Sequence, residues 1–331
     1  MKHLFFVFFA ILVSWTHAQV SDFKDIDFAK ADNTAKLYEG YSLDNLPVLV
    51  HKLTYKLHTD VEKFRAIYYW VCHNIKNDIR QGNRVIRKRT KLDSLEYLKW
   101  NSTYKKNVFK TLLRRKKTMC TGYAYLIKEL CFLANIECKI IDGYGRSSQS
   151  NAESLDMPNH SWNAVKLNNK WYLCDATWSS GYSLNNIFVA DYNDGYFLTD
   201  PVLFAQNHYP LHKKWLLNEN LINAKFIASP LVYGETFEYN VLPISPNKMA
   251  ITTKKNTPIE FKVKSDKLIS EDQISMVQFV GTKEITFKIS NIKTENGLTS
   301  FTCQYPYKGY YDAHLKINED IVATYIVRVS K

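Results

Sequence analysis

Apolar residues recur with the period of a helix in two segments of the chain. The first segment begins at Asp60, a residue suited to an N-cap. Its apolar stripe is Val61, Phe64, Tyr68, Val71 and Ile75. The second segment ends before Asn135, which tolerates the left-handed backbone that ends helices. Its stripe is Cys120, Ala124, Ile127, Cys131 and Ala134. Both patterns predict amphipathic helices, and the second places Cys120 at a helix N-terminus on the face turned toward the core.

The pattern is weaker before and between these helices. Residues 19–58 are poorly patterned and are expected to form a leader. Residues 79–91 are basic and predict a mobile connection rather than a helix. A short helical stretch is expected over residues 92–100.

Strand patterns follow the second helix. Residues 138–144 predict a strand and residues 145–159 an exposed polar loop. Residues 160–167 and 170–178 predict a hairpin about Asn168-Asn169, because two asparagines tolerate the positive φ angles of a type I′ turn.

The register of this hairpin brings two polar residues together. Pairing about the Asn-Asn turn places Trp162 opposite Asp175 and His160 opposite Thr177. His160 and Asp175 then lie on one face of the sheet as diagonal neighbours, roughly 7–8 Å apart at Cα. An aspartate at this distance can hold a histidine.

Beyond residue 230 the pattern changes to short strands separated by Asn, Pro, Gly, Lys and Asp. The clearest of them cover residues 237–243, 259–265, 284–290 and 320–329. They predict an all-β sandwich, similar to immunoglobulin-like domains, over residues 230–331. The chain has 331 residues, of which 46% are apolar, so it can fill more than one core.

The N-terminal residues have the pattern of a secretory signal peptide. Lys2 precedes an apolar run over residues 4–15, and small residues precede an expected cleavage after Ala18. The run is too short to span a bilayer, and no later stretch is long and apolar enough. We therefore expect residues 1–18 to be removed, no transmembrane segment, and a periplasmic or extracellular protein.

Charge and cysteine usage exclude several classes of function. The net charge is +12, with basic clusters at residues 84–89 and 114–117, which predict a solvated surface attracted weakly to anionic envelope material. No nucleic-acid-binding motif accompanies them, so no nucleic acid partner is expected. The six cysteines are irregularly spaced, which predicts no disulfide framework, and no zinc-ligand pattern is present. We expect no metal and no cofactor.

The candidate chemistry involves three residues. A helix N-terminus favours the thiolate of Cys120, and a neighbouring imidazolium lowers the thiol pKa further. If the helix packs on the hairpin, Cys120 can attack an acyl carbon and His160 can accept and return the proton. Asp175 would then fix the tautomer and orientation of the imidazole.

Three sequence blocks carry a family resemblance. They are "EKFRAIYYWVCHNIKND", "CTGYAYLIKELCFLANIECKIIDGY" and "NHSWNAVKLNNKWYLCDATW". Together they resemble the transglutaminase-like superfamily of papain-like cysteine enzymes, and "YFLTDPVLFAQNHYPLHKKWLL" is similar to the segment that follows the core in kyphoscoliosis peptidase-like members. The resemblance covers residues 60–217. It implies a catalytic triad of Cys120, His160 and Asp175.

The fold expected from these patterns is α+β. It has a transglutaminase-like (papain-like) core over residues 59–225, with helices packed on an antiparallel sheet, followed by the sandwich. The expected function is thiol-dependent hydrolysis of peptide or amide bonds in a protein or peptide substrate, with cell-envelope material as a further candidate. Two alternatives stay open: a transglutaminase that joins glutamine to amines, and a non-catalytic envelope-binding or scaffold protein.

The roles of some neighbouring residues stay open. Trp162 and Trp178 are expected either to form walls of the substrate cleft or to serve packing. His208 is expected to be structural, because nothing in the sequence places it beside the triad. The oxyanion site needs a donor besides the backbone N–H of Cys120, and Gln81, Trp100 and Asn101 are candidates.

Overall fold

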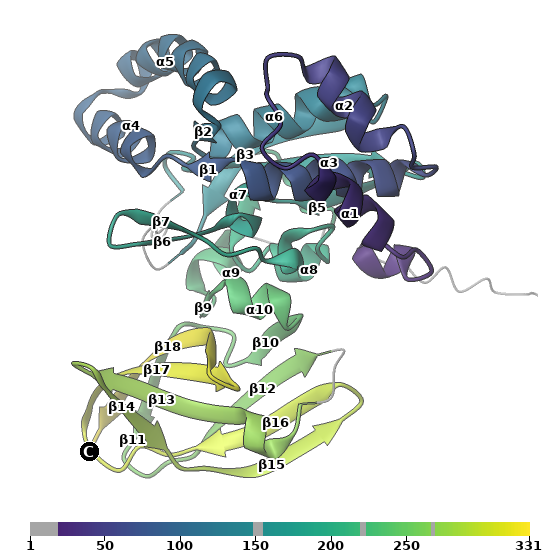
Figure 1. Ribbon diagram of the computed structural model, residues 1–331. Helices are drawn as coiled ribbons and strands as arrows, with labels where there is room; N and C mark the ends of the chain where they lie inside the picture. Colours follow the sequence, from purple (N-terminus) through teal and green to yellow (C-terminus); the bar gives the residue numbers. More distant parts are fainter. Residues whose placement is uncertain (1–18, 148–154, 219–222, 266–268) are drawn as a thin grey trace, which may run out of the picture.

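The computed structural model describes residues 19–147, 155–218, 223–265 and 269–331 (Figure 1). The expected signal peptide and the middle of the expected loop at residues 145–159 lie outside these ranges. Helices and a four-stranded antiparallel sheet form the first part of the chain, and an all-β sandwich forms the last part. This arrangement confirms the predicted α+β fold.

The first predicted helix is α3 (Asp60–Asn74), which runs through the main core. Its N-cap is Thr59 rather than Asp60. The side chain of Thr59 accepts a hydrogen bond from the backbone N–H of Glu62, and the Glu62 carboxylate accepts one from the backbone N–H of Thr59. This capping box satisfies two backbone donors that would otherwise be unpaired at the helix start.

The expected leader folds against α3, which the weak pattern did not predict. It forms η1 (Val20–Phe23), α1 (Ala29–Leu37) and α2 (Leu46–Thr54). These elements bury few residues each, such as Ala31 on α1 and Leu49 on α2, so their apolar stripes are short. Arg65 of α3 is buried and donates two hydrogen bonds to the Asp32 carboxylate of α1, at 2.7 and 2.9 Å.

The expected connection at residues 79–91 is a helix, and the helix after it is longer than predicted. They are α4 (Ile79–Lys91) and α5 (Ser94–Arg115), which lie together at one side of the helical half (Figure 1). Asp78 and Asp93 cap them by accepting hydrogen bonds from the backbone N–H groups of Gln81 and Glu96. Helix α4 buries one residue, Val85. Its sequence therefore has no stripe of apolar residues that would have predicted a helix.

The sheet of the first part has the order β5-β4-β3-β8. Its strands are β3 (Cys138–Gly145), β4 (His160–Leu167), β5 (Lys170–Cys174) and β8 (His208–Pro210). Helix α6 (Cys120–Leu133) packs against β3 and β4. The helix ends near Asn135, whose φ is 58°, as its residue type predicts.

The hairpin has the predicted turn and register. Asn168 and Asn169 have φ angles of 48° and 63°, and Leu167 pairs with Lys170. Pairing stops at Asn163 with Cys174, however, so the expected pairs of Trp162 with Asp175 and His160 with Thr177 do not form. The chain leaves the sheet because Asp175 caps a short helix, α7 (Ala176–Ser179).

The remaining elements that precede the sandwich strands are short. They are β1 (Lys76–Asn77), β2 (Lys117–Thr118), β6 (Gly181–Leu184), β7 (Ile187–Ala190), η2 (Asp194–Tyr196), α8 (Pro201–Phe204), η3 (Lys213–Leu216), α9 (Asn223–Ala228), β9 (Leu231–Val232) and α10 (Gly234–Glu238). Strands β1 and β2 pair in parallel, and β6 and β7 form a hairpin.

The sandwich consists of two sheets that enclose a separate core. One sheet has the order β10-β12-β16-β15, and the other has the order β11-β18-β17-β13-β14 with β9 paired to β18. The elements are β10 (Val241–Ser245), β11 (Ala250–Lys254), β12 (Ile259–Ser265), η4 (Glu271–Gln273), β13 (Ile274–Val280), β14 (Lys283–Phe287), β15 (Ile289–Glu295), β16 (Leu298–Cys303), β17 (Gly309–Ile317) and β18 (Asp320–Ser330). Across the described ranges, no helix carries an apolar stretch that would cross a bilayer.

Candidate active site

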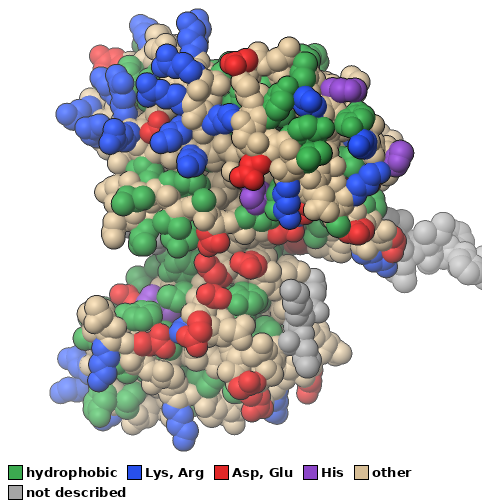
Figure 2. Space-filling model, viewed as in Figure 1, with side chains coloured by type: hydrophobic (Ala, Val, Ile, Leu, Met, Phe, Trp, Pro, Cys, Tyr) green, Lys and Arg blue, Asp and Glu red, His purple; other side chains and the backbone are tan. Residues whose placement is uncertain are grey.

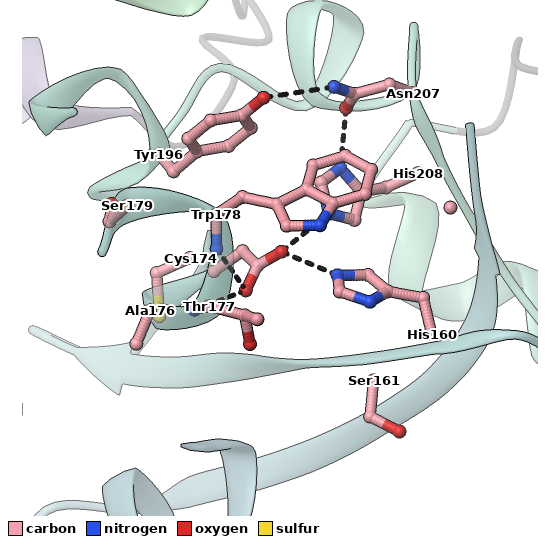
Figure 3. Close-up of polar contacts among 12 residues, drawn as sticks. His160, Ser161, Cys174, Ala176, Thr177, Trp178, Ser179, Tyr196, Asn207 and His208 are labelled. Carbon is pink, nitrogen blue, oxygen red and sulfur yellow. Dashed lines mark hydrogen bonds and ion pairs between the residues drawn. The ribbon is translucent and has the colours of Figure 1, made fainter. Parts of the chain in front are cut away.

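His160 and Asp175 lie beside each other at the end of the sheet (Figure 3). His160 is the first residue of β4, and Asp175 follows the last residue of β5. The Nε2 atom of His160 is 2.6 Å from Oδ2 of Asp175. The other carboxylate oxygen accepts hydrogen bonds from the backbone N–H groups of Thr177 and Trp178, at 2.8 and 3.3 Å. The N-terminal turn of α7 thus fixes the carboxylate that orients the histidine.

Cys120 begins α6 and faces the same histidine. Its side chain is half-buried, whereas the other five cysteines are buried. None of the six forms a disulfide. Burial raises the pKa of its thiol, but hydrogen bonding and charge from His160, with a hydrogen bond from the backbone N–H of Ser161, lower it by more. The pKa of Cys120 therefore lies below its ordinary value. Because Nε2 of His160 faces Asp175, Nδ1 is the ring nitrogen left for the thiol.

The imidazole and the carboxylate are both held in their charged forms. Burial lowers the pKa of His160, but Asp175 and Cys120 outweigh it and raise that pKa to about 10. Burial raises the pKa of Asp175, but His160 and His208 hold it well below its usual range. The arrangement therefore favours the thiolate of Cys120 more than in an ordinary cysteine, beside a His160 imidazolium and an ionised Asp175.

His208 contacts the same carboxylate, although nothing in the sequence placed it beside the triad. It is fully buried on β8, and its Nε2 is 3.1 Å from Oδ2 of Asp175. Strand β8 pairs with β3, which places Gly145 opposite His208. This pairing joins residues far apart in the sequence, and no local pattern around His208 indicates it.

A second hydrogen-bond chain supports His208 (Figure 3). Nδ1 of His208 is 2.6 Å from the Asn207 side chain, which is also 3.2 Å from the hydroxyl of Tyr196. Burial lowers the pKa of His208 to about 4, so the ring is neutral and carries one N–H. The side-chain nitrogen of Asn207 donates to the hydroxyl of Tyr196, and its side-chain oxygen faces Nδ1 of His208.

The two tryptophans have different positions. Trp178 stacks on His160 with ring centroids 4.6 Å apart and lines a cavity of about 360 Å³. Trp162 is only 1% exposed and packs edge-on against His208 at 5.0 Å. The expected cleft role therefore does not hold for Trp162, which packs in the interior because its strand position faces the small core around Phe204.

The three candidate oxyanion donors lie on helices α4 and α5. Trp100 and Asn101 lie within α5, where Trp100 stacks on Tyr104 at 4.6 Å. Gln81 lies in the first turn of α4 and donates to Asp78, whose backbone N–H donates to the carbonyl of Thr118, two residues before Cys120. Of the three, Gln81 is tied to the segment that leads into the thiol.

The site also contains a set of possible metal ligands. His160, Asp175 and His208 each offer one ligand atom, and these three atoms lie within 4.8 Å of one another. The hydrogen bonds from both histidines to Oδ2 of Asp175 account for this closeness without an ion.

Comparison with known proteins agrees with this geometry. Residues 48–176 match the family model of the transglutaminase-like superfamily. The kyphoscoliosis peptidase of Homo sapiens is 34% identical over 205 residues, which cover 60% of this chain and 27% of that protein. The kyphoscoliosis peptidase of Mus musculus is 33% identical over 68% of this chain and 32% of that protein. Hillarin of Drosophila melanogaster is 27% identical over 65% of this chain and 26% of that protein.

The chain spans less than a third of the length of these relatives. The similarity includes the helix that begins at Cys120 and the hairpin that carries His160, both of which lie within the matched residues. Residues 48–176 therefore form a domain of the transglutaminase-like superfamily, and the chain is similar to the kyphoscoliosis peptidases within it.

Proposed function

We propose that this chain is a thiol-dependent acyl-transfer enzyme that hydrolyses peptide or amide bonds. The observation that carries the proposal is the hydrogen bond between His160 and Asp175, together with the lowering of the Cys120 pKa by His160. A buried ion pair at a helix N-terminus with a half-exposed nucleophile is typical of a catalytic cysteine rather than a core thiol.

The reaction follows from the positions of these groups. The Cys120 thiolate attacks the acyl carbon, and a sulfur–carbon bond forms. As the carbon–nitrogen bond breaks, the His160 imidazolium donates its proton to the leaving amine. Water then attacks the thioester, His160 accepts the proton of that water, and the thiolate is released with the acid product.

A specific feature favours an amine as the second candidate acceptor. The cavity beside Trp178 is also lined by Asp191, Glu235 and Glu238, whose charge suits a protonated amine. Once it had lost a proton, such an amine could attack the thioester in place of water. His160 would accept the next proton of the amine, the Cys120 thiolate would leave, and a new amide bond would form, which is the transglutaminase reaction. Water needs no site of its own, so hydrolysis remains the first candidate.

One experiment separates these outcomes. The protein is incubated with a glutamine-containing peptide, with and without a primary amine, and the products are identified by mass. We expect hydrolysis in both reactions and none with Cys120→Ala. Amine incorporation in excess of hydrolysis would reverse the ranking. Binding of envelope polymer that Cys120→Ala leaves unchanged, without any turnover, would support a non-catalytic scaffold instead.

Export belongs to the same proposal. The residue pattern over positions 1–18 supports cleavage after Ala18, so that the mature protein would begin at Gln19. Mass spectrometry of the N-terminal peptide, from protein recovered outside the cytoplasm, tests it. Recovery of the protein only inside the cell, with residues 1–18 intact, would contradict export.

A further inference from the structure

The positive charge of the chain is concentrated in one segment. Residues 76–117 contain fifteen Lys and Arg against three Asp and Glu, a net charge of +12. The whole chain also has a net charge of +12, so the rest of the sequence is balanced. This segment comprises β1, α4, α5 and β2. Figure 2 shows the blue side chains gathered over the corner that α4 and α5 occupy in Figure 1.

Part of this charge surrounds a hollow of about 710 Å³. The hollow lies between α4, the C-terminal end of α5, the β1–β2 pair and the β6–β7 hairpin. The cations that line it are Lys76, Arg80, Arg84, Arg87, Arg115 and Lys117. We call them the hollow cations.

The hollow cations have no acidic partners in the described ranges. All six are exposed, and no carboxylate oxygen lies within 4.0 Å of their charged nitrogens. The one acidic residue in the lining is Asp78, and its two oxygens accept hydrogen bonds from the backbone and side chain of Gln81. Six like charges around one hollow repel one another, so an anion that enters the hollow relieves this repulsion.

The hollow adjoins the strand pair that precedes the helix of the reactive thiol. Lys76 and Asn77 of β1 pair with Lys117 and Thr118 of β2, and Cys120 follows two residues after Thr118. Asn77 also lines the cavity beside Trp178, so it belongs to both openings. The two openings therefore adjoin at Asn77, and Trp178 of the second opening stacks on His160.

We propose that the hollow binds an acidic peptide segment of the protein substrate and so directs the adjoining bond to Cys120. This inference rests on the proposed acyl-transfer function. Arginine presents a planar fork of donors that matches a carboxylate, and four of the hollow cations are arginines. Ile187 and Phe188 add apolar surface to the lining, which suits the mixed side chains of a peptide.

The test measures binding without catalysis. A fluorescent peptide of alternating Glu and Ser is titrated into the full chain carrying Cys120→Ala, and anisotropy gives Kd. In the hollow variant Arg80, Arg87, Arg115 and Lys117 are replaced by Gln. In the matched control variant Lys91, Lys99, Lys106 and Lys110, which are exposed on α4 and α5 outside the hollow lining, are replaced by Gln. Both variants lose four charges from exposed positions, and unchanged circular dichroism and Tm show that each is folded.

We expect Kd to rise at least about tenfold in the hollow variant and less than about threefold in the control, because nearby unscreened charges dominate peptide binding. A peptide of alternating Lys and Ser should not bind. Equal losses in both variants would show diffuse attraction and overturn the proposal. Tighter binding of a single-stranded oligonucleotide with the same number of charges would also overturn it, in favour of a nucleic acid.

Failure of this inference can be distinguished from failure of the proposed function. If the protein binds the acidic peptide through the hollow cations but shows no turnover, the acyl-transfer proposal fails and the binding-site proposal stands. If acidic and neutral peptides are turned over with the same KM, and this KM is unchanged in the hollow variant, the acyl-transfer proposal stands and the binding-site proposal fails.

Discussion

The reactivity of Cys120 depends on a short chain of side chains behind it. Tyr196, Asn207, His208 and Asp175 are buried, and each is linked to the next by a hydrogen bond. His160 stands between this chain and the thiol. The pKa of Cys120 is set by burial and by His160, Ser161 and Asp175, and the pKa of Asp175 is lowered in turn by His208.

Alkylation against pH tests the ion pair. Because the pKa of Cys120 is lowered, the thiolate persists below the pH at which an ordinary cysteine is protonated, about 8.5. Iodoacetamide should therefore modify Cys120 in the native protein at lower pH than any buried thiol. In His160→Ala the stabilising imidazolium is absent, burial dominates, and the reactive pH range should move above that of a free cysteine. Peptide mass spectrometry measures the extent of alkylation at each cysteine.

Cys131 is the internal control for this measurement. It lies in the same helix but is buried, and burial raises its pKa well above the ordinary value. If Cys120 is alkylated no faster than Cys131 in the folded wild type, Cys120 is a core thiol and the enzyme proposal fails.

Substitution of His208 tests its positioning role. His208→Leu removes a hydrogen bond to Asp175, so we expect kcat to fall about tenfold to a hundredfold with little change in KM. The charge of Asp175 then acts more fully on His160, so the upper pH limit of activity should move above about 10. His208→Gln, which keeps an N–H donor, should recover part of the rate. A lower rate with an unmoved pH limit would indicate packing alone.

At the scale of elements, the sequence predicts the features that depend on residues close together in the chain. The hairpin register depends on two adjacent asparagines, and it correctly places His160 beside Asp175. The position of His208 depends on the β3–β8 pairing, which local pattern does not reveal. Helix α4 lacks an apolar stripe because it buries little, but Asp78 and Gln81 have the spacing of a helix cap and could have predicted it.

Gly143 tests the importance of the β3–β8 contact. A Cβ at this position would lie 2.3 Å from the carbonyl oxygen of Tyr209 and 2.5 Å from the Trp162 ring. Gly143→Ala should therefore push β8 away, lower the free energy of unfolding by about 3 kcal/mol, and reduce activity through His208. Urea unfolding and kcat measure the two effects.

Gly82 supplies the matched control for the same substitution. It lies within α4, and a Cβ there would have no neighbour within 4 Å. Gly82→Ala should leave kcat unchanged and raise stability by roughly 0.5–1 kcal/mol, because alanine favours a helix. A Gly143→Ala protein as stable and active as Gly82→Ala would show that the close approach is not required.

At the scale of the whole molecule, a buried arginine joins the sheet to the segment that enters the sandwich. Arg146 follows β3 and is 1% exposed. Its guanidinium donates to the hydroxyl of Ser229 at 2.7 Å and to the carbonyl oxygen of Ser229 at 3.0 Å. Burial lowers the pKa of Arg146 to about 10, so it remains a cation at neutral pH.

Replacement of Arg146 should weaken this connection. In Arg146→Gln the carbonyl groups around Ser229 lose their donors, so we expect a loss of about 3 kcal/mol in the free energy of unfolding. Calorimetry should show the sandwich and the helical part melting less cooperatively than in the wild type. Arg80→Gln is the control, because Arg80 is exposed and should change stability by less than about 0.5 kcal/mol. Identical melting curves for both variants would contradict this role.

The wide spacing of the site residues also affects the order of events during folding. His160 and Asp175 belong to one hairpin and its adjoining turn, so they can meet early, whereas Cys120 and His208 join only when α6 and β8 dock on β3. Until then Cys120 is an ordinary thiol with the same intrinsic reactivity as the other five. We therefore expect the nucleophile to form only after α6 and β8 have docked on β3, so that a misfolded chain would lack it.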